Sequence, residues 1–169
     1  FRAFTTSDFN ITNYPHKINS YPQIYNYIDT MHEPKAHRYF NEKNFLVDKE
    51  EKIIIEQINE KILNISKNDF NKVIVPISAT LASIPLLRVI KKIKEIFNLK
   101  KVNIFEVGPG SGYFGIMNYL NGDKYISTEN SQAFYIWQNI LMKNFSKEND
   151  FFDYVYDELG NLKNQNLVH

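Results

Sequence analysis

The sequence of 169 residues contains no cysteine. This absence excludes a disulfide framework and thiolate metal ligands, and it fits the reducing cytoplasm, where we expect the protein. Long apolar runs are missing too, because the uncharged stretch 73–87 has only 15 residues and contains Pro76 and Pro85. A membrane-spanning helix needs about 20 apolar residues. We therefore expect no membrane insertion.

Excess charge of either sign is also lacking. The chain has 20 Lys and Arg residues against 19 Asp and Glu residues, which gives a formal net charge of +1. A basic row follows one predicted helix from Arg88 through Lys91 to Lys94, but Glu95 interrupts it. Because lysines on helix surfaces are usually solvated, we expect no nucleic-acid partner for this row.

The first residues show no targeting signal. The sequence starts at Phe1 rather than at Met, and its first ten residues have no long apolar core. We therefore expect a trimmed start without a secretory signal peptide. Residues 1–19 mix polar and aromatic side chains without a period, which indicates an irregular lead-in.

One segment, 32–37, has the sequence His-Glu-Pro-Lys-Ala-His, which is close to a zinc-protease motif. Its second histidine, His37, lies five residues after His32 where the motif requires four, and Pro34 interrupts the helix that must present both. Two histidines at this spacing do not share a helix face. We expect no metal site.

The first 99 residues are predicted to form a helical N-terminal region, 1–99. With 43% hydrophobic and 15% aromatic residues, the chain is not a disordered sequence. Ser20 is placed to cap a first helix that has Pro22 in its first turn and ends at Pro34. One face of this helix holds Ile24, Tyr27, Ile28 and Met31.

Two longer amphipathic helices are predicted at 48–65 and 79–99, with a turn at 68–71 between them. The first has an inward stripe of Ile54, Ile55, Ile58, Ile62 and Ile65, and it directs Glu51, Lys52, Glu56 and Lys61 away from this stripe. The second carries Leu86, Val89, Ile90, Ile93, Ile96 and Phe97, opposite an outer face with Arg88, Lys91, Lys92 and Lys94. We interpret both helices as packing elements.

A short apolar run, 102–107, leads into glycines at the alternate positions 108, 110 and 112. Glycine removes Cβ where the chain reverses, so a ligand can approach the backbone closely. Apolar residues then recur at helical spacing from Tyr113. The turn therefore opens a helix N-terminus, whose N–H groups and dipole favour a negative group, and we expect a nucleotide or nucleoside cofactor.

Two cofactor classes use such a turn, and the sequence matches both patterns. Residues 110–115, Gly-Ser-Gly-Tyr-Phe-Gly, fit the dinucleotide spacing G-x-G-x-x-G of an NAD(P)- or FAD-binding oxidoreductase. Residues 106–112, Glu-Val-Gly-Pro-Gly-Ser-Gly, place a carboxylate at the end of the strand. A carboxylate repels a pyrophosphate by several kcal/mol in a low-dielectric cleft, but it attracts the ammonium and sulfonium of S-adenosylmethionine. Glu106 therefore favours S-adenosylmethionine.

Residues 106–112 resemble the first motif of the Rossmann-like S-adenosylmethionine-dependent methyltransferases. The second motif follows where that family has it, because a predicted strand, 125–127, leads to Glu129, which lies 21 residues after Gly108. The resemblance implies that Glu106 holds the methionine end of the cofactor, and that Glu129 accepts hydrogen bonds from the ribose hydroxyls. The cofactor-binding residues implied are Glu106, Gly108, Pro109, Gly110, Ser111, Gly112, Tyr113, Glu129 and Asn130, the last against the adenine.

A narrower resemblance covers residues 105–169. The segments 105–113, 125–135 and 138–139 are similar to the sugar O-methyltransferases of bacterial glycan, polysaccharide and glycoside biosynthesis. The implied activity is transfer of a methyl group to a hydroxyl of a sugar or glycoside. That group has a His-x-Pro-Trp-Trp motif after a later strand, and this sequence stops at His169. The resemblance implies His169 as the catalytic base.

Residues 100–169 are predicted to form the first part of a Rossmann-like domain that binds S-adenosylmethionine. Strand, glycine turn, helix, strand and helix follow one another in βαβ order. Ser131 is placed to cap a helix over 132–144, and short strands are predicted within 152–156 and 166–169. This last helix is predicted to direct Phe134, Trp137 and Leu141 inward and Gln138 and Asn139 outward.

The predicted fold class is α/β, with an incomplete Rossmann-like parallel sheet preceded by the helical region. The first strand of such a sheet is usually central, so the strand at 102–107 is predicted to lack one of its two neighbours. We therefore expect the N-terminal portion or a fragment of an enzyme, which alone is incomplete for catalysis. The alternatives are an oxidoreductase and a non-catalytic cofactor-binding fragment.

Overall fold

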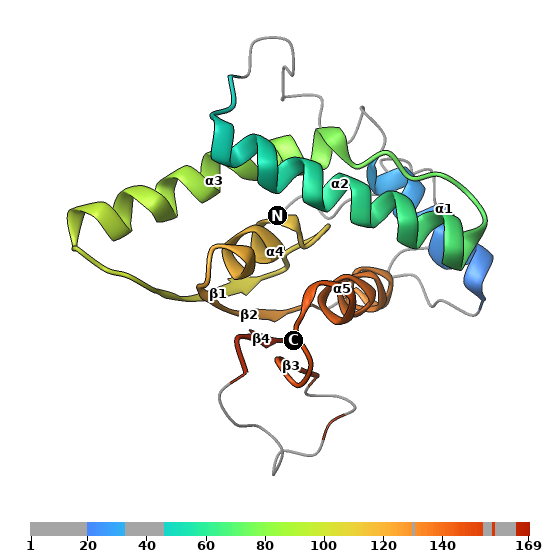
Figure 1. The fold of residues 1–169 in the computed structure, drawn as a ribbon. Coiled ribbons are helices and arrows are strands. Elements are labelled where there is room, and N and C mark those ends of the chain that lie inside the picture. Colours follow the sequence, from blue (N-terminus) through green and yellow to red (C-terminus); the bar gives the residue numbers. More distant parts are fainter. Residues whose placement is uncertain (1–19, 33–45, 130, 154–156, 158–164) are drawn as a thin grey trace, which may run out of the picture. The chain divides into compact units, whose positions relative to one another are not determined.

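The computed structural model describes residues 20–32, 46–129, 131–153, 157 and 165–169 (Figure 1). The chain divides into two compact units. Unit 1 comprises Phe1–Ile84 and Ser131–Ala133, and unit 2 comprises Pro85–Asn130 and Phe134–His169. The domain boundary expected at residue 99 stays a prediction.

Helix α1, Tyr21–His32, begins directly after Ser20. Ile24 and Ile28 are buried, which confirms the inward face for these two residues. Outside the described residues lie the side chains of Tyr27 and Met31 and the segment 33–45, with Pro34 and His37.

Helix α2, Lys49–Phe70, begins with a capping box. The Asp48 side chain accepts a hydrogen bond from the Glu51 N–H at 2.8 Å, and the Glu51 carboxylate accepts one from the Asp48 N–H at 2.9 Å. Glu51 is therefore 1% exposed, so the prediction that it faces away from the core is wrong. The turn predicted at 68–71 is wrong as well, because the helix continues until Asn71 closes it with a left-handed backbone.

The isoleucine stripe of α2 is confirmed. All five isoleucines of the predicted inward face are buried, and Ile58 and Ile62 are fully buried. Tyr25 of α1 contacts Phe70 of α2 with ring centroids 5.9 Å apart, and the Lys72 ammonium lies 4.1 Å from the Tyr25 centroid. Helices α1 and α2 thus pack together within unit 1 by an aromatic contact, and Lys72, just after α2, adds a cation–π contact.

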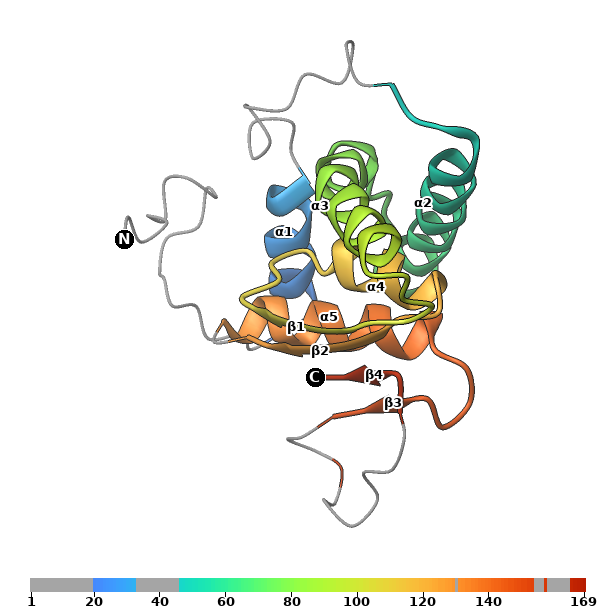
Figure 2. The same cartoon turned by 90° about the vertical axis from the view of Figure 1, so that its left-hand side faces the viewer.

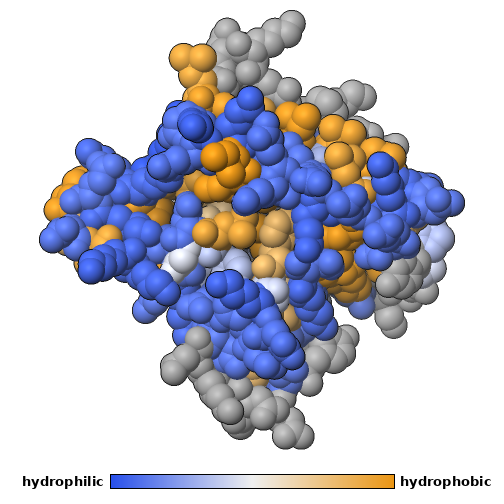
Figure 3. All heavy atoms as spheres, viewed as in Figure 1, coloured by the Kyte–Doolittle hydropathy of each residue, from blue (hydrophilic) through white to orange (hydrophobic). Residues whose placement is uncertain are grey.

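Helix α3, Ile77–Ile96, contains Pro85 and passes from unit 1 into unit 2. Its buried side includes Ile84 and Leu87, and it continues to Lys94, which pairs with Asp123. The predicted apolar stripe is therefore displaced around the helix. The residues predicted inward but found exposed are Leu86, Val89, Ile93, Ile96 and Phe97. Figure 3 shows apolar surface at the left, where α3 ends.

Unit 2 contains a four-stranded parallel sheet in the order β1-β2-β4-β3, which Figures 1 and 2 both show. The strands are β1 Asn103–Val107, β2 Lys124–Thr128, β3 Phe151–Phe152 and β4 Leu167–Val168. Helix α4, Tyr113–Leu120, follows β1, and helix α5, Gln132–Phe145, follows β2. The predicted α/β class, with helices before an incomplete Rossmann-like parallel sheet, is confirmed. None of the helices described is long and apolar enough to cross a bilayer.

Strand β1 lies at the edge of the described sheet. It pairs with β2 from Asn103 to Val107, and no described strand pairs with its other side, as predicted. Its side chains alternate between two faces, of which the face with Phe105 and Val107 is exposed, at 64% and 74%. Ile104 and Glu106 point to the opposite, half-buried face, which carries the site.

Candidate functional site

The glycine turn, residues 108–112, leads from β1 into α4. Gly108, Gly110 and Gly112 have φ values of 68°, 59° and 77°. Residues with a Cβ are strained at such angles, which explains the alternating glycines. The Gly108 N–H donates to the Thr128 carbonyl at 2.9 Å, so the turn is attached to the end of β2.

The other members of the turn have different surroundings. Pro109 and Ser111 are half-buried, and the Gly112 N–H donates to the Pro109 carbonyl at 3.1 Å. Tyr113 begins α4 with a side chain that is 0% exposed, so its ring packs in the interior. The N-terminal end of α4 adjoins the glycine turn. It carries the N–H groups of a helix start and the positive end of the helix dipole.

Glu106 is half-buried beside the turn. One of its carboxylate oxygens accepts a hydrogen bond from the Tyr125 hydroxyl at 2.5 Å. Burial raises the pKa of Glu106, the bond from Tyr125 opposes this rise, and the negative charge of Glu129 adds to it. Glu106 and Glu129 thus bring two carboxylates to the end of the turn, where the charge of Glu129 disfavours ionisation of Glu106.

Tyr125 holds its position through helix α4. It is fully buried, and an edge-on contact joins its ring to Phe114, with centroids 6.5 Å apart. A Cβ on Gly115 would lie 2.3 Å from the Tyr125 ring, so only glycine allows α4 to approach β2 this closely. Gly115 is therefore explained by helix–strand packing.

Gln138 of α5 joins the turn to the second acidic residue. Its side-chain amide donates to the Gly110 carbonyl at 2.7 Å and to the Glu129 carboxylate at 3.3 Å. Gln138 is 0% exposed and Asn139 is 8% exposed, so the prediction that both point outward is wrong. The glycine turn covers this side of α5, because Gly112 leaves room for the Gln138 side chain.

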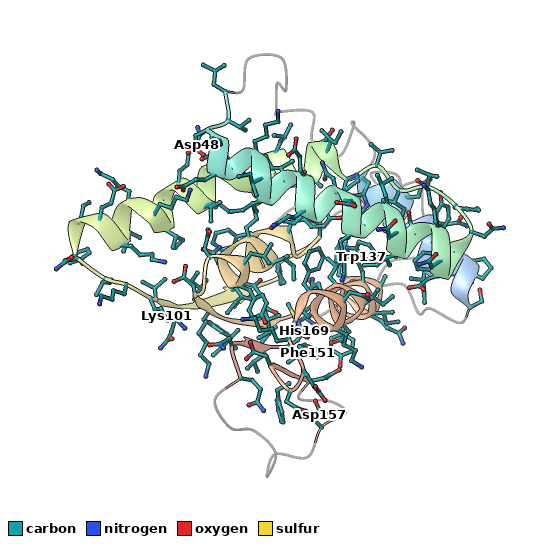
Figure 4. All side chains as sticks on the ribbon, in the orientation of Figure 1. Asp48, Lys101, Trp137, Phe151, Asp157 and His169 are labelled. Atoms are coloured by element: carbon teal, nitrogen blue, oxygen red, sulfur yellow. The ribbon has the colours of Figure 1, made fainter. Side chains whose placement is uncertain are left out.

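His169 follows β4 and is 4% exposed. Its Nδ1 lies 2.7 Å from the Ser127 hydroxyl, and its ring stacks on Tyr135 with centroids 4.8 Å apart. Tyr135 in turn donates to Asp153 at 2.5 Å. Burial lowers the pKa of His169 to about 4, against the opposing charge of Asp153, so the imidazole is neutral at pH 7. The His169 N–H donates to the Phe152 carbonyl of β3 at 2.9 Å, and Figure 4 labels His169 at this end of the sheet.

The parallel strands bring the predicted site residues to one edge of the sheet. Glu106 is the register partner of Ser127, which contacts His169, and Glu129 comes directly after the end of β2. Ligands of open α/β sheets bind outside the carboxyl ends of the strands. Asn130, predicted against the adenine, lies outside the described residues.

Three residues of the site were not predicted from the sequence, namely Tyr125, Ser127 and Gln138. Tyr125 and Ser127 alternate along β2 and so share one face of the strand, a signal that the sequence does contain. Their partners depend on the register between β1 and β2, which pairs Glu106 with Ser127 and which no local pattern reveals.

The fold and the glycine turn define an α/β protein with a Rossmann-like parallel sheet. In the part of the chain that the structure describes, no three His, Asp or Glu side chains gather as a metal site requires. The sequence matches no protein-family model, and comparisons with curated proteins and with solved structures found no match either.

Proposed function

We propose that this chain binds S-adenosyl-L-methionine at the glycine turn, as part of an enzyme that methylates a sugar hydroxyl. The observation that carries the proposal is the pair of carboxylates beside the turn. Glu106 is turned inward onto Tyr125, and Glu129 lies near enough to raise the Glu106 pKa. Two negative charges at a cofactor turn suit a ligand with an ammonium and a sulfonium group.

Each part of the site has a role in this proposal. Glu106 accepts hydrogen bonds from the cofactor ammonium, and Glu129 accepts them from the ribose hydroxyls. The backbone from Gly108 to Gly112 lets the methionine portion approach without obstruction by a Cβ. Asn130 is proposed against the adenine.

The dinucleotide alternative is less favourable at the same turn. A pyrophosphate placed there would face the negative potential of Glu106 and Glu129, at a cost of several kcal/mol. The third glycine of the dinucleotide spacing, Gly115, does not separate the two classes, because that spacing itself requires a glycine there for close helix–strand packing, as against the Tyr125 ring. The two carboxylates are therefore what favours S-adenosylmethionine over NAD(P) and FAD.

We propose His169, which is neutral at pH 7, as the general base that removes the proton of the acceptor hydroxyl. A sugar or glycoside hydroxyl oxygen attacks the methyl carbon, the carbon–sulfur bond breaks as the carbon–oxygen bond forms, and S-adenosylhomocysteine leaves. The hydroxyl proton passes to the imidazole. The protein contributes mainly alignment of donor and acceptor and exclusion of water. We place this reaction in the cytoplasm.

Calorimetric titrations of the chain with S-adenosylmethionine and with NAD separate the two cofactor classes. We expect heat from one S-adenosylmethionine site and none from NAD, because only the first ligand brings positive charge to the two carboxylates. Binding of NAD without binding of S-adenosylmethionine would overturn the proposal, and so would binding of neither.

A further inference from the structure

The second half of helix α3 exposes large apolar side chains within unit 2. Leu87 and Lys94 take the buried side of this half, and the residues at helical spacing on the opposite side face solvent. Figure 3 shows hydrophobic and hydrophilic surface side by side where α3 ends. We name the exposed apolar residues, which are 37% to 67% exposed, the α3 apolar surface: Val89, Ile93, Ile96, Phe97 and Leu99.

The end of α3 holds this surface on an ordered turn. Asn98 adopts a left-handed backbone at φ 52°, and its N–H donates to the Glu95 carbonyl at 3.3 Å. The Leu99 N–H donates to the Lys94 carbonyl at 2.8 Å. These two bonds form a Schellman motif, which closes a helix and satisfies its last carbonyls. The apolar side chains are therefore exposed on a closed helix end and not on an unravelled one.

Positive charge gathers along the same segment. Residues 85–101 hold six of the 20 Lys and Arg residues of the chain but one of its 19 Asp and Glu residues. The rest of the chain has 14 basic and 18 acidic residues, so the net charge of +1 combines a positive segment with a negative remainder. The single acid, Glu95, pairs with Lys92 at 2.9 Å. Lys100 and Lys101 are exposed and come directly after the apolar residues.

We propose that the α3 apolar surface docks this protein on an anionic phospholipid bilayer. The apolar side chains enter the boundary between headgroups and acyl chains, and the ammonium groups of Lys100 and Lys101 contact the lipid phosphates. The helix lies along the bilayer surface and does not cross it. This docking is independent of the proposed S-adenosylmethionine site.

Charge and apolar area together favour a bilayer over other occupants of this surface. In a two-fold dimer the same surface of each copy meets the other, so Lys100 and Lys101 of both copies would come together and repel. A nucleic acid would satisfy the lysines but would leave the apolar side chains in water. An anionic bilayer offers phosphates and apolar chains in one surface.

Co-sedimentation of the full chain with lipid vesicles tests the docking. We expect binding to vesicles of equal parts phosphatidylglycerol and phosphatidylcholine, and roughly tenfold weaker binding to phosphatidylcholine alone, which carries no net negative charge. Added salt should weaken the binding to anionic vesicles by screening. Absence of binding to the anionic vesicles would overturn the proposal, and so would equal binding to both kinds.

Two exposed isoleucines on different helices provide a matched pair of variants. Ile96→Gln removes apolar area that enters the bilayer, so we expect it to bind anionic vesicles roughly tenfold more weakly than the wild type. Ile53→Gln makes the same change at an exposed position of α2 and should bind like the wild type. Equal binding of the two variants would overturn the role of the α3 apolar surface.

A second matched pair tests the charges. The double variant Lys100→Gln with Lys101→Gln should lose most of the preference for anionic vesicles, whereas Lys52→Gln with Lys67→Gln, which removes the same charge from α2, should keep it. An equal preference in both double variants would contradict the phosphate contacts. A lipid-free dimer that Ile96→Gln converts into monomers would assign the surface to a second copy and overturn the bilayer.

Discussion

The side-chain amide of Gln138 lies 2.7 Å from the carbonyl oxygen of Gly110, so helix α5 holds the glycine turn in place. The same amide nitrogen donates to Glu129 at 3.3 Å, which uses both of its hydrogens. Reversing the amide would set its oxygen against two acceptors, so the orientation is determined by the contacts. One neutral side chain thus connects the turn to the residue proposed for the ribose.

Replacing Gln138 with Leu should weaken S-adenosylmethionine binding about ten- to hundredfold. The change leaves the Gly110 carbonyl and the Glu129 carboxylate without their shared donor, and an unmade buried hydrogen bond costs about 1–3 kcal/mol. Gln132→Leu is the matched control, since Gln132 is an exposed glutamine of the same helix. Calorimetry that gives equal affinities for the two variants would contradict the role of Gln138.

The local part of the site was predictable from the sequence. The carboxylate of Glu106, the alternating glycines and the acid at 129 form a short pattern with a physical reason at each position. Gln138 could not be predicted in this way, because helical periodicity directed Trp137 and Leu141 inward and left Gln138 beside them. Its burial depends on the glycine turn, which lies 28 residues earlier in the sequence.

The same limit applies to the pairing of strands. Strands β3 and β4 are two residues long, and β4 lies between β2 and β3. The contact between Ser127 and His169 spans 42 residues and follows from that strand order together with the register between β2 and β4. On α3, similarly, no local pattern reveals that Lys94 pairs with Asp123, which lies 29 residues later in the sequence.

Two glycine variants should differ sharply in stability. Gly115→Ala places a Cβ 2.3 Å from the Tyr125 ring, and we expect a loss of roughly 3 kcal/mol in the free energy of unfolding. Gly108→Ala meets nothing within 4 Å, so only its backbone strain at φ 68° remains, roughly 1 kcal/mol. Urea unfolding measures both, and an equal loss would contradict the close packing of α4 on β2.

The ion pair between Lys94 and Asp123 should contribute strongly to unit 2. Asp123 is 1% exposed, pairs with Lys94 at 2.8 Å and accepts the Val102 N–H at 3.0 Å. Lys94→Met leaves this buried charge uncompensated, so we expect a loss of roughly 3 kcal/mol. Lys92→Met, which removes an exposed pair with Glu95, should cost far less, because water screens that pair. Similar urea midpoints for the two variants would refute this difference.

Stability should fall on acidification because of His169. Its folded pKa of about 4 lies below the ordinary value of 6.5, so the unfolded chain takes up the proton first. The stabilisation that depends on the neutral His169 imidazole is fully present above pH 6.5 and is lost as the pH falls from 6.5 to 4. Relative to His169→Gln, the wild type should lose about 2 kcal/mol over this range, after allowance for partial solvent screening. Parallel pH profiles of the two proteins by thermal unfolding would exclude the buried neutral imidazole.

Binding of S-adenosylmethionine should also weaken on acidification. The Glu106 pKa is raised above its ordinary value of 4.5, and only the ionised carboxylate attracts the cofactor ammonium. The dissociation constant should therefore rise as the pH falls through this raised pKa, and Glu106→Gln should remove that part of the pH dependence. Calorimetry across the pH range measures the dissociation constant. The same pH dependence in the wild type and in Glu106→Gln would argue against titration of Glu106.

The most direct measurement is calorimetric titration of S-adenosylmethionine into the wild type and Glu106→Gln at neutral pH. Glutamine keeps an oxygen that accepts from Tyr125 and removes only the charge, while Glu148→Gln, at an exposed position, removes the same charge elsewhere. We predict that Glu106→Gln binds roughly ten- to hundredfold more weakly, as expected for a lost charge-assisted hydrogen bond, and that Glu148→Gln binds like the wild type. Equal affinity of the wild type and Glu106→Gln would contradict the recognition of a cationic cofactor by this carboxylate.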